Sequence, residues 1–287
     1  MLRHALAIGV AIIPIIGTSA RAEAYSGFTK NQGELFVKVA FSTFTSNDFY
    51  DLSGRLNDRG QDFTQRNIGV YAEYGIIDGL TASANIPALR INSYANTNSA
   101  VGFGDVQLAL KYGVRLFGFH LAASVMPELP LGDADATVQT NSGLNLVLPT
   151  GDGEFNVWSQ LAVSRGFSIA PIPWLDGWVS AGAGFNLRTK GYAHQVGFGG
   201  ELGLRFFDLA FVQGRLRGQI VPSEDLDTSS GFIYGEGTEF LTVGAGVAVL
   251  VPETPLMATF DFEVPVAGQL NLYSGPVFIA GIALNAG

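Results

Sequence analysis

The segment DVQLALKYGVR, residues 105–115, alternates strictly between apolar side chains and polar or small ones. Val106 and Leu108 fall on one face of an extended chain, whereas Gln107 and Lys111 fall on the other. Because successive side chains of a strand point to opposite faces, this alternation predicts a strand with one apolar and one polar surface. The pattern alone leaves open which of the two surfaces faces water.

The same alternation recurs along the chain and predicts about twelve strands of roughly 10 to 15 residues each. No helical period of useful length is present. The other predicted strands cover about 34–41, 67–74, 80–86, 119–126, 156–163, 177–188, 193–206, 209–221, 238–251, 255–266 and 271–285.

The connections between these strands fall into two classes that alternate along the chain. The tight ones are 75–79, 117–119, 206–209 and 252–255, and the long polar ones are 46–61, 91–103, 130–152 and 222–236. Short turns at one end and long loops at the other are typical of a bacterial outer-membrane barrel with both termini in the periplasm.

The first 24 residues have the pattern of a secretory signal peptide. A basic start, MLRH, precedes the short apolar run ALAIGVAIIPIIG, and SARAEA then provides small residues at A-x-A spacing. We expect cleavage after Ala22 or Ala24, which leaves 25–287 as a single barrel domain. Beyond residue 24 there is no run of 18 apolar residues, the length that a spanning helix needs.

The number of strands decides between a soluble barrel and a membrane barrel. About eight strands enclose an interior that side chains just fill. Twelve long strands with their apolar face inward would leave an apolar void, so we place lipid outside and a polar lumen inside. Aromatic residues near the expected periplasmic strand ends fit an interfacial girdle: Tyr74, Phe117, Phe119, Trp174, Trp178, Phe206 and Phe207. The predicted fold is an all-β, transmembrane, antiparallel up-and-down β-barrel of about twelve strands in the cell outer membrane.

Composition excludes several function classes. The chain has no cysteine, which excludes disulfides and thiolate metal sites. Its net charge is −9 and no basic cluster is present, which argues against a nucleic-acid partner.

The polar strand faces predict the residues that line the lumen. A Lys or Arg that faced hydrocarbon at mid-depth would cost about 2–4 kcal/mol, so the charged strand residues belong on the wet side. We expect Glu201 to pair with Arg215 across the ladder if the preceding turn centres on Asp208. Such charges either satisfy one another structurally or filter polar solutes. The predicted pore-lining residues are Lys38, Glu73, Asp105, Lys111, Arg115, Glu201, Arg205, Arg215, Arg217, Asp261 and Glu263.

Four aromatic residues also fall on the predicted luminal face: Phe36, Tyr71, Trp158 and Phe240. They either pack against the wall or offer flat stacking surfaces to an aromatic or apolar solute. Residues 23–32, which precede the first strand, are too few for a plug domain but could partly obstruct the periplasmic mouth.

The sequence predicts no catalytic residues, no cofactor and no metal site. His120 and His194 are expected at opposite ends of the barrel, so they cannot share a dyad or a metal. Asp133, Asp135 and Asp152 offer oxygen ligands that Ca²⁺ could use, but a solvated acidic loop is the favoured interpretation.

Two motifs carry a resemblance to a known family. VGFGDVQLALKYGVRL (101–116) and LPTGDGEFNVWSQLAVSRGF (148–167) resemble the G-x-G-D and P-T-G-x-G passages of the phenol meta-pathway (MetA-pathway of phenol degradation) outer-membrane proteins. PELPLGDADAT (127–137) sits where these proteins carry a first P-x-G loop. The resemblance implies an outer-membrane channel for aromatic or other hydrophobic solutes.

We therefore expect a passive outer-membrane channel for small molecules, with hydrophobic or aromatic compounds as candidate solutes. Its expected partners are membrane lipid and the small solute. A monomer is slightly favoured over an oligomer. Two alternatives stay open: an outer-membrane enzyme such as a lipid hydrolase at the rim, and a non-conducting barrel that displays 46–61 and 130–152 for adhesion.

Overall fold

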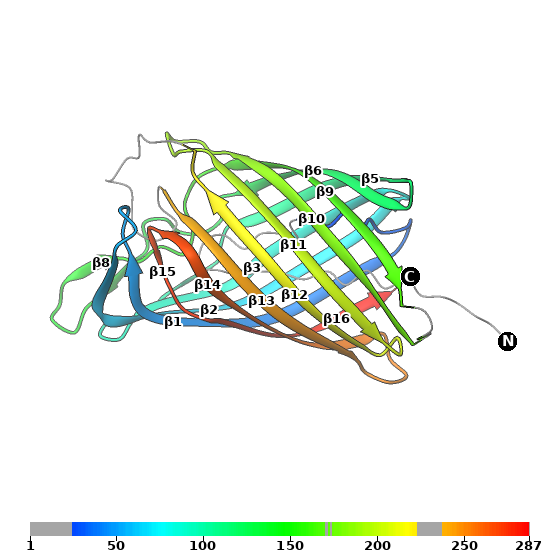
Figure 1. Ribbon diagram of the computed structural model, residues 1–287. Helices are drawn as coiled ribbons and strands as arrows, with labels where there is room; N and C mark the ends of the chain where they lie inside the picture. The colour runs from blue at the N-terminus through cyan, green and yellow to red at the C-terminus, as the bar shows by residue number, and fades with distance from the viewer. Residues whose placement is uncertain (1–24, 170–171, 173, 223–236, 287) are drawn as a thin grey trace.

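The computed structural model describes residues 25–169, 172, 174–222 and 237–286, and Figure 1 shows their course. Within these residues no helix is long and apolar enough to cross a membrane. The strands are β1 (Leu35–Tyr50), β2 (Leu56–Ile77), β3 (Leu80–Tyr94), β4 (Ala100–Gly102), β5 (Val106–Leu116), β6 (Phe119–Leu129), β7 (Thr137–Gln139), β8 (Asn145–Val147), β9 (Asn156–Ser168), β10 (Leu175–Leu187), β11 (Gln195–Phe206), β12 (Ala210–Ile220), β13 (Glu239–Leu250), β14 (Leu256–Leu270), β15 (Leu272–Tyr273) and β16 (Val277–Ala286).

Twelve of these strands form one closed antiparallel barrel: β1, β2, β3, β5, β6, β9, β10, β11, β12, β13, β14 and β16. Closure occurs because β1 pairs with β2 on one side and with β16 on the other, from Leu35↔Ala286 to Phe44↔Val277. A closed sheet leaves no unpaired backbone edge for lipid to meet. The predicted fold and strand number are confirmed.

The two ends of the barrel differ as the connections predicted. At the turn end, hairpins such as the one at Phe117 and Gly118 are tight, and both of these residues have positive φ, at 52° and 81°. β1 begins and β16 ends at this same end, where the C-terminus is marked in Figure 1. The opposite end, called the loop end below, carries the longer connections.

The predicted loop limits are corrected in three places. Residues 46–61 are mostly strand, because β1 and β2 extend to Tyr50 and Leu56 and leave a turn of only 51–55. Residues 91–103 likewise include the end of β3 and the short β4, and 130–152 contains the β7–β8 hairpin. The sequence of these extensions is mostly polar, with SND at 46–48 and NDRGQ at 57–61, and was therefore predicted as loop, although Phe49 within it is buried against Tyr273. The predicted loop 222–236 lies outside the described residues from 223 onward.

The two faces of β5 show which side of the wall is apolar. Leu108, Leu110 and Tyr112 are 42%, 55% and 57% exposed on the outside of the barrel, whereas Gln107 is fully buried inside it. Val106, at the loop end of the strand, is the exception on the outer face and is buried. The apolar surface of the barrel therefore faces outward, toward lipid, and the polar surface faces inward.

Most of the predicted girdle is exposed at the turn end. Tyr74, Phe117, Phe119, Trp174 and Phe207 have exposed side chains, and the rings of Trp174 and Phe207 stack at 4.7 Å. Phe206 is half-buried.

The prediction for Trp178 was wrong. Its ring lies against Phe211, which is buried, and its indole N–H donates to Glu201. Gly203 makes room for this inward placement, because a Cβ there would meet the Trp178 ring at 2.0 Å.

Candidate functional site

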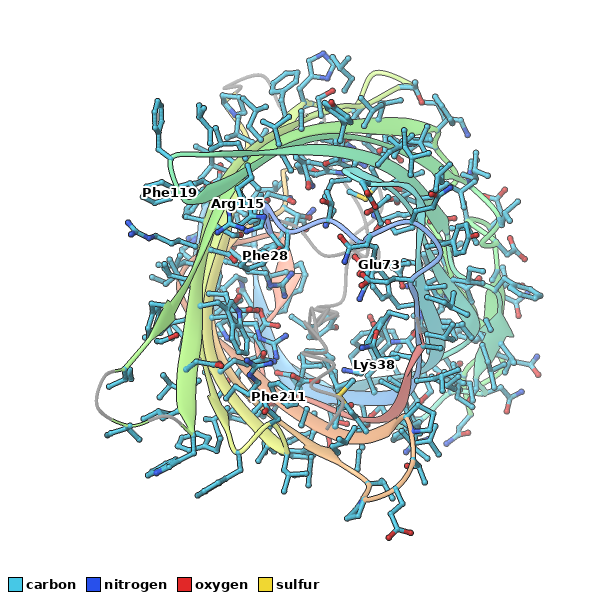
Figure 2. The ribbon with its side chains drawn as sticks, turned by 90° about the vertical axis from the view of Figure 1, so that its right-hand side faces the viewer. Phe28, Lys38, Glu73, Arg115, Phe119 and Phe211 are labelled. Atoms are coloured by element: carbon cyan, nitrogen blue, oxygen red, sulfur yellow. The ribbon has the colours of Figure 1, made fainter. Side chains whose placement is uncertain are left out.

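Residues 25–34, the N-terminal strap, lie against the inner wall of the barrel. The backbone N–H groups of Gly27 and Lys30 donate to the hydroxyls of Ser164 and Thr81 at 2.7 and 2.8 Å. Gly33 then donates to the Gly75 carbonyl at 2.9 Å. The strap thus crosses from β9 to β2, and Figure 2, which views the barrel from the turn end, shows Phe28 inside the ring of strands.

The wall has glycines where the strap crosses it. A Cβ on Gly75 would stand 1.8 Å from the Asn31 carbonyl oxygen, and one on Gly113 would stand 2.7 Å from a Thr29 methyl carbon. On β11, a Cβ on Gly199 would meet the Tyr25 ring at 2.5 Å. These missing side chains form a shallow track that fits the strap.

A charged group lies beside the strap near the turn end. Glu73 stands between the ammonium groups of Lys30 and Lys111, at 3.9 and 3.8 Å, and accepts a hydrogen bond of 2.7 Å from the Tyr71 hydroxyl. Lys30 also lies 5.2 Å from the centroid of the Phe36 ring.

The middle of the lumen carries a ladder of buried ion pairs. Asp261 on β14 accepts from Lys38 on β1 at 2.9 Å and from Arg215 on β12. One step toward the loop end, Arg217 donates through Nε to Glu263 at 3.0 Å. All five side chains are at most 9% exposed, so each charge depends on its partner rather than on bulk water.

Glu201 and Arg215 are directly opposite in the β11–β12 register, as predicted, but they do not form an ion pair. The guanidinium of Arg215 reaches past β13 to pair with Asp261 on β14, and Glu201 accepts from Trp178. The register could be predicted from one hairpin, whereas the choice of partner depends on a third strand, β14.

The remaining predicted luminal charges lie at the two ends. Arg205 pairs with Asp176 and with Asp208, at 3.2 Å for the latter, close to the turn end. Arg115 is exposed at that end of β5, opposite His120 in the register. Asp105 precedes β5 at the loop end.

The connection between β6 and β9, residues 130–155, folds inward at the loop end. Leu148 and Thr150 are fully buried. Arg90 on β3 donates to the Thr150 carbonyl at 2.7 Å, and Asn92 donates to the Pro149 carbonyl at 2.6 Å. This infolded loop was predicted as an external polar loop, and only its β7–β8 hairpin projects beyond the barrel in Figure 1.

Asp105 anchors the infolded loop at two points. Its carboxylate accepts from the backbone N–H groups of Gly132 and Asp152, at 3.0 and 2.8 Å. A Cβ on Gly151 would stand 2.4 Å from the same carboxylate. The two motifs that carry the family resemblance and the segment 127–137 therefore meet at one aspartate.

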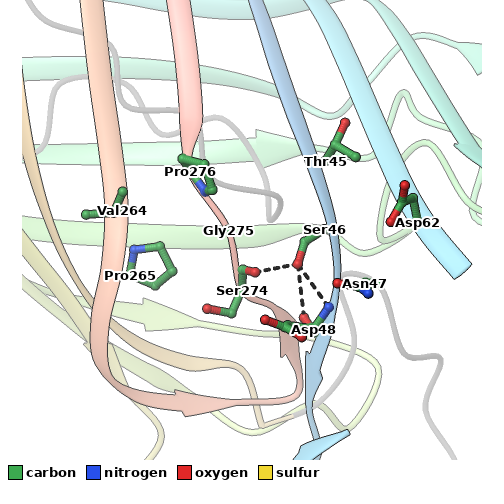
Figure 3. Close-up of a pocket in the computed structure, with 10 residues that line it drawn as sticks. All are labelled: Thr45, Ser46, Asn47, Asp48, Asp62, Val264, Pro265, Ser274, Gly275 and Pro276. Carbon is green, nitrogen blue, oxygen red and sulfur yellow. Dashed lines mark hydrogen bonds between the residues drawn. The ribbon is translucent and has the colours of Figure 1, made fainter. Parts of the chain in front are cut away.

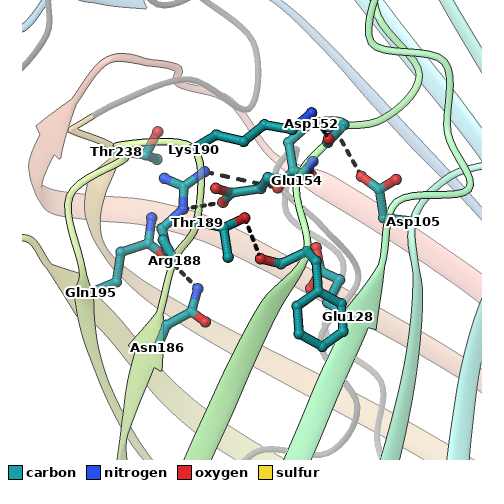
Figure 4. Close-up of polar contacts among 12 residues, drawn as sticks. Asp105, Glu128, Asp152, Glu154, Asn186, Arg188, Thr189, Lys190, Gln195 and Thr238 are labelled. Atoms are coloured by element: carbon teal, nitrogen blue, oxygen red, sulfur yellow. Dashed lines mark hydrogen bonds and ion pairs between the residues drawn. The ribbon is translucent and has the colours of Figure 1, made fainter.

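Four carboxylates gather where this loop meets the wall. Figure 4 shows Asp105, Glu128, Asp152 and Glu154 beside Arg188, which pairs with Asp152 at 3.8 Å and with Glu154. Burial, followed by the neighbouring Glu128 and Asp105 carboxylates, raises the pKa of Asp152 to about 9. Burial also raises the pKa of Glu154, to about 7, although Arg188 opposes that shift.

The four predicted luminal aromatic residues, Phe36, Tyr71, Trp158 and Phe240, are at most 5% exposed, and the rings of the first two meet edge to face at 6.3 Å. A second aromatic cluster at the loop end was not predicted. Phe63 stacks on Tyr273 at 4.9 Å, and the Tyr273 hydroxyl donates to the Tyr94 hydroxyl at 3.1 Å. The cluster also contains Phe44 and Phe49. Alternation within β1, β2 and β3 hints at it, but the predicted strands ended too early to include it.

His120 and His194, the histidines among the described residues, lie at opposite ends of the barrel. The His120 ring is 4.8 Å from Phe28 at the turn end, and His194 accepts a backbone N–H from Arg188 at the loop end. Asp133 and Asp135 are exposed.

A cleft of about 450 Å³ opens between β1 and β14 near the loop end (Figure 3). There β16 has not yet begun, and Pro265 and Pro276 have no N–H to continue a ladder. Ser274 instead donates to the Asp48 carbonyl at 2.8 Å. The other residues that line the cleft are Thr45, Ser46, Asn47, Asp62, Val264 and Gly275.

Comparisons with known proteins place the fold among outer-membrane barrels. Neither a family model nor a curated protein sequence matches this chain. Among solved structures, the chain is similar to the COG4313 outer membrane channel from Pseudomonas putida F1, with a TM-score of 0.64 and 14% identity over 90% of this chain and 97% of that one. It also matches the β domain of the Bordetella autotransporter BrkA, with a TM-score of 0.49 and 12% identity over 89% and 100% of the two chains. At 14% identity the likeness to the first of these structures shows the fold alone, which is that of an outer-membrane β-barrel.

Proposed function

We propose that this protein is a passive channel that carries small molecules through its lumen across the outer membrane. The observation that carries the proposal is the buried ladder around Asp261 inside a barrel whose outer face is apolar. A charged, polar interior that crosses the apolar belt supplies the wet side of a transmembrane barrel. Passive transport needs no catalytic residue, cofactor or energy source, and we propose a non-enzymatic protein.

The path that we propose is narrow and partly obstructed at both ends. The N-terminal strap lies against the inner wall and occupies part of the lumen at the turn end. The infolded loop occupies part of the lumen at the loop end. Twelve strands lie between a filled eight-stranded barrel and an open porin of sixteen or more strands, so these segments occupy a large share of the lumen. We expect small solutes and low conductance.

Aromatic or other hydrophobic small molecules are the solute class that we propose. The support is the cluster around Phe63 and Tyr273 at the loop end, together with Trp158 deeper in the lumen. Aromatic rings offer offset-stacked or edge-on contacts to a flat solute. Since these rings are buried, their contact with a solute requires the infolded loop to shift. The resemblance of the G-x-G-D and P-T-G-x-G motifs agrees with this class, and the similarity to an outer-membrane channel agrees with a channel role.

A second candidate function is surface display without conduction. It rests on the β7–β8 hairpin, whose Leu144 and Val147 are 66% and 57% exposed outside the barrel. Deletion of 137–147 would abolish binding to a partner on this interpretation and leave solute flux unchanged.

The experiment is a flux measurement in proteoliposomes with two anions of similar size, benzoate and cyclohexanecarboxylate. We expect both to enter faster than into empty liposomes, and benzoate to enter faster than its saturated counterpart. Equal flux of the two anions would remove the aromatic preference and keep the channel. Flux equal to that of empty liposomes, with a barrel shown to be folded by heat-modifiable gel mobility, would contradict the channel itself.

A further inference from the structure

The carboxylates at the loop end come from three separate parts of the chain. Asp105 precedes β5, Glu128 lies near the end of β6, and Asp152 belongs to the infolded loop. One carboxylate oxygen of each lies within 4.8 Å of the others. Asp105 and Glu128 are at most 1% exposed, and the Asp152 side chain is 7% exposed.

Such close burial of like charges is unfavourable unless something compensates for it. Carboxylates that lose their hydration repel one another strongly in a low-dielectric interior. Arg188 contacts Asp152 and Glu154, Gln107 donates to Glu128, and backbone N–H groups reach Asp105. The fold nevertheless brings four acidic groups together at the point where the loop is anchored.

A neutral side chain beside the cluster gives an independent indication of a ligand. Asn156 stands opposite Glu128 in the β6–β9 register, and its side chain hydrogen-bonds Glu154. Its carbonyl oxygen, Oδ1, is buried and has no hydrogen-bond partner, and the same is true of Oε2 of Glu154. Buried acceptors are normally satisfied, so two such atoms beside three converging carboxylates suggest a positively charged ligand between them.

We propose that Asp105, Glu128 and Asp152, completed by the free oxygens of Glu154 and Asn156, bind one Ca²⁺ ion that clamps the infolded loop to β5 and β6. Ca²⁺ takes carboxylate and amide oxygens at 2.3–2.6 Å, so opposite ligands stand about 4.6–5.2 Å apart. The three carboxylate oxygens lie within 4.8 Å of one another, which is close enough for all of them to reach one such ion. Mg²⁺ keeps several of its waters and demands near-ideal octahedral geometry, so an all-protein set of ligands suits it less well than Ca²⁺. The site is independent of whether the lumen conducts.

The test uses residues 25–287 folded in detergent. Bound metal is first removed with EDTA, and the EDTA is then removed before the titration. Calorimetric titration with CaCl₂ should show one saturable site, and CaCl₂ should raise the thermal midpoint more than MgCl₂ does. Asp152→Asn and Glu128→Gln should each weaken Ca²⁺ binding at least about 10-fold, the lower end of the effect of losing even an outer-shell partner of a metal. Asp135→Asn is the matched control, because Asp135 is an exposed carboxylate of the same loop.

Heat-modifiable mobility establishes that each variant is folded before its affinity is measured. If Glu128→Gln fails to fold, Asn156→Ala removes one neutral ligand oxygen without changing the charge, and its Ca²⁺ affinity should also fall. A folded wild-type barrel without saturable Ca²⁺ binding would overturn the proposal. So would binding that Asp135→Asn weakens as much as Asp152→Asn does.

Discussion

The carbonyl oxygen of Asn31 lies over Gly75, 1.8 Å from the point where a Cβ of that residue would stand. Two backbone hydrogen bonds at 2.9 Å, from Gly33 to Gly75 and from Gly75 to Glu34, hold the strap at the same place. Residue 75 must therefore be glycine for the two backbones to approach so closely. The placement of the N-terminal strap depends on this one residue of the wall.

Gly75→Ala should displace the strap and destabilise the barrel by about 1–3 kcal/mol, the usual cost of overpacking. Because the strap occupies part of the turn end, its displacement should also raise the single-channel conductance. Gly214→Ala is the control, since a Cβ at Gly214 meets no atom within 4 Å. Equal conductance and equal thermal midpoints for the two variants would show that the strap is not seated as described.

Arg90→Ala should release the infolded loop. The side chain is 1% exposed and donates to the Thr150 carbonyl and, at 3.0 Å, to the Asn67 amide oxygen. Loss of a donor to buried acceptors costs about 1–3 kcal/mol. We expect faster hydrogen exchange across 148–154 and a lower thermal midpoint.

Arg66→Ala removes the same charge from the exposed face of β2 and serves as the control for Arg90→Ala. Exchange across 148–154 that is equally slow in both variants would mean that Arg90 does not hold the loop.

Asp261→Asn should change both stability and ion selectivity. The substitution leaves Lys38 and Arg215 as buried cations without their shared carboxylate, which costs about 3–5 kcal/mol. The lumen becomes more positive at mid-depth, so the reversal potential in a salt gradient should shift toward anion selectivity. Asp62→Asn, at an exposed residue of β2, should leave both quantities unchanged. An unaltered reversal potential in a folded Asp261→Asn barrel would place the ladder outside the ion path.

Two substitutions of Tyr273 separate its hydroxyl from its ring. Tyr273→Phe removes the 3.1 Å bond to Tyr94 and should cost about 0.5–1.5 kcal/mol while the stack on Phe63 stays. Tyr273→Ala also removes the stack and should reduce block of the current by an added aromatic solute such as benzoate. Equal block in wild type and Tyr273→Ala would exclude the cluster from the aromatic path.

Sequence periodicity was sufficient to predict the barrel, but it could not predict that the infolded loop lies inside it. Leu108, Leu110 and Tyr112 identify the lipid face, because every strand repeats the same two-residue period. The infolded loop has no such period. Its position depends on contacts from Arg90 on β3 and from Asp105 just before β5, so it was predicted as an external loop.

The partner of each charged side chain was harder to predict than the face of the strand on which that side chain lies. The Lys38, Asp261 and Arg215 group spans β1, β14 and β12, and its geometry depends on barrel closure. The carboxylate site was missed for a similar reason, because Glu128 and Asp152 lie far from Asp105 in the sequence and meet only through folding of the loop.

Single-channel recording of residues 25–287 in a planar bilayer tests the central claim most directly. The account predicts small, discrete conductance steps that increase in Gly75→Ala and not in Gly214→Ala. A folded and inserted barrel that passes no current in either variant would contradict the proposed channel.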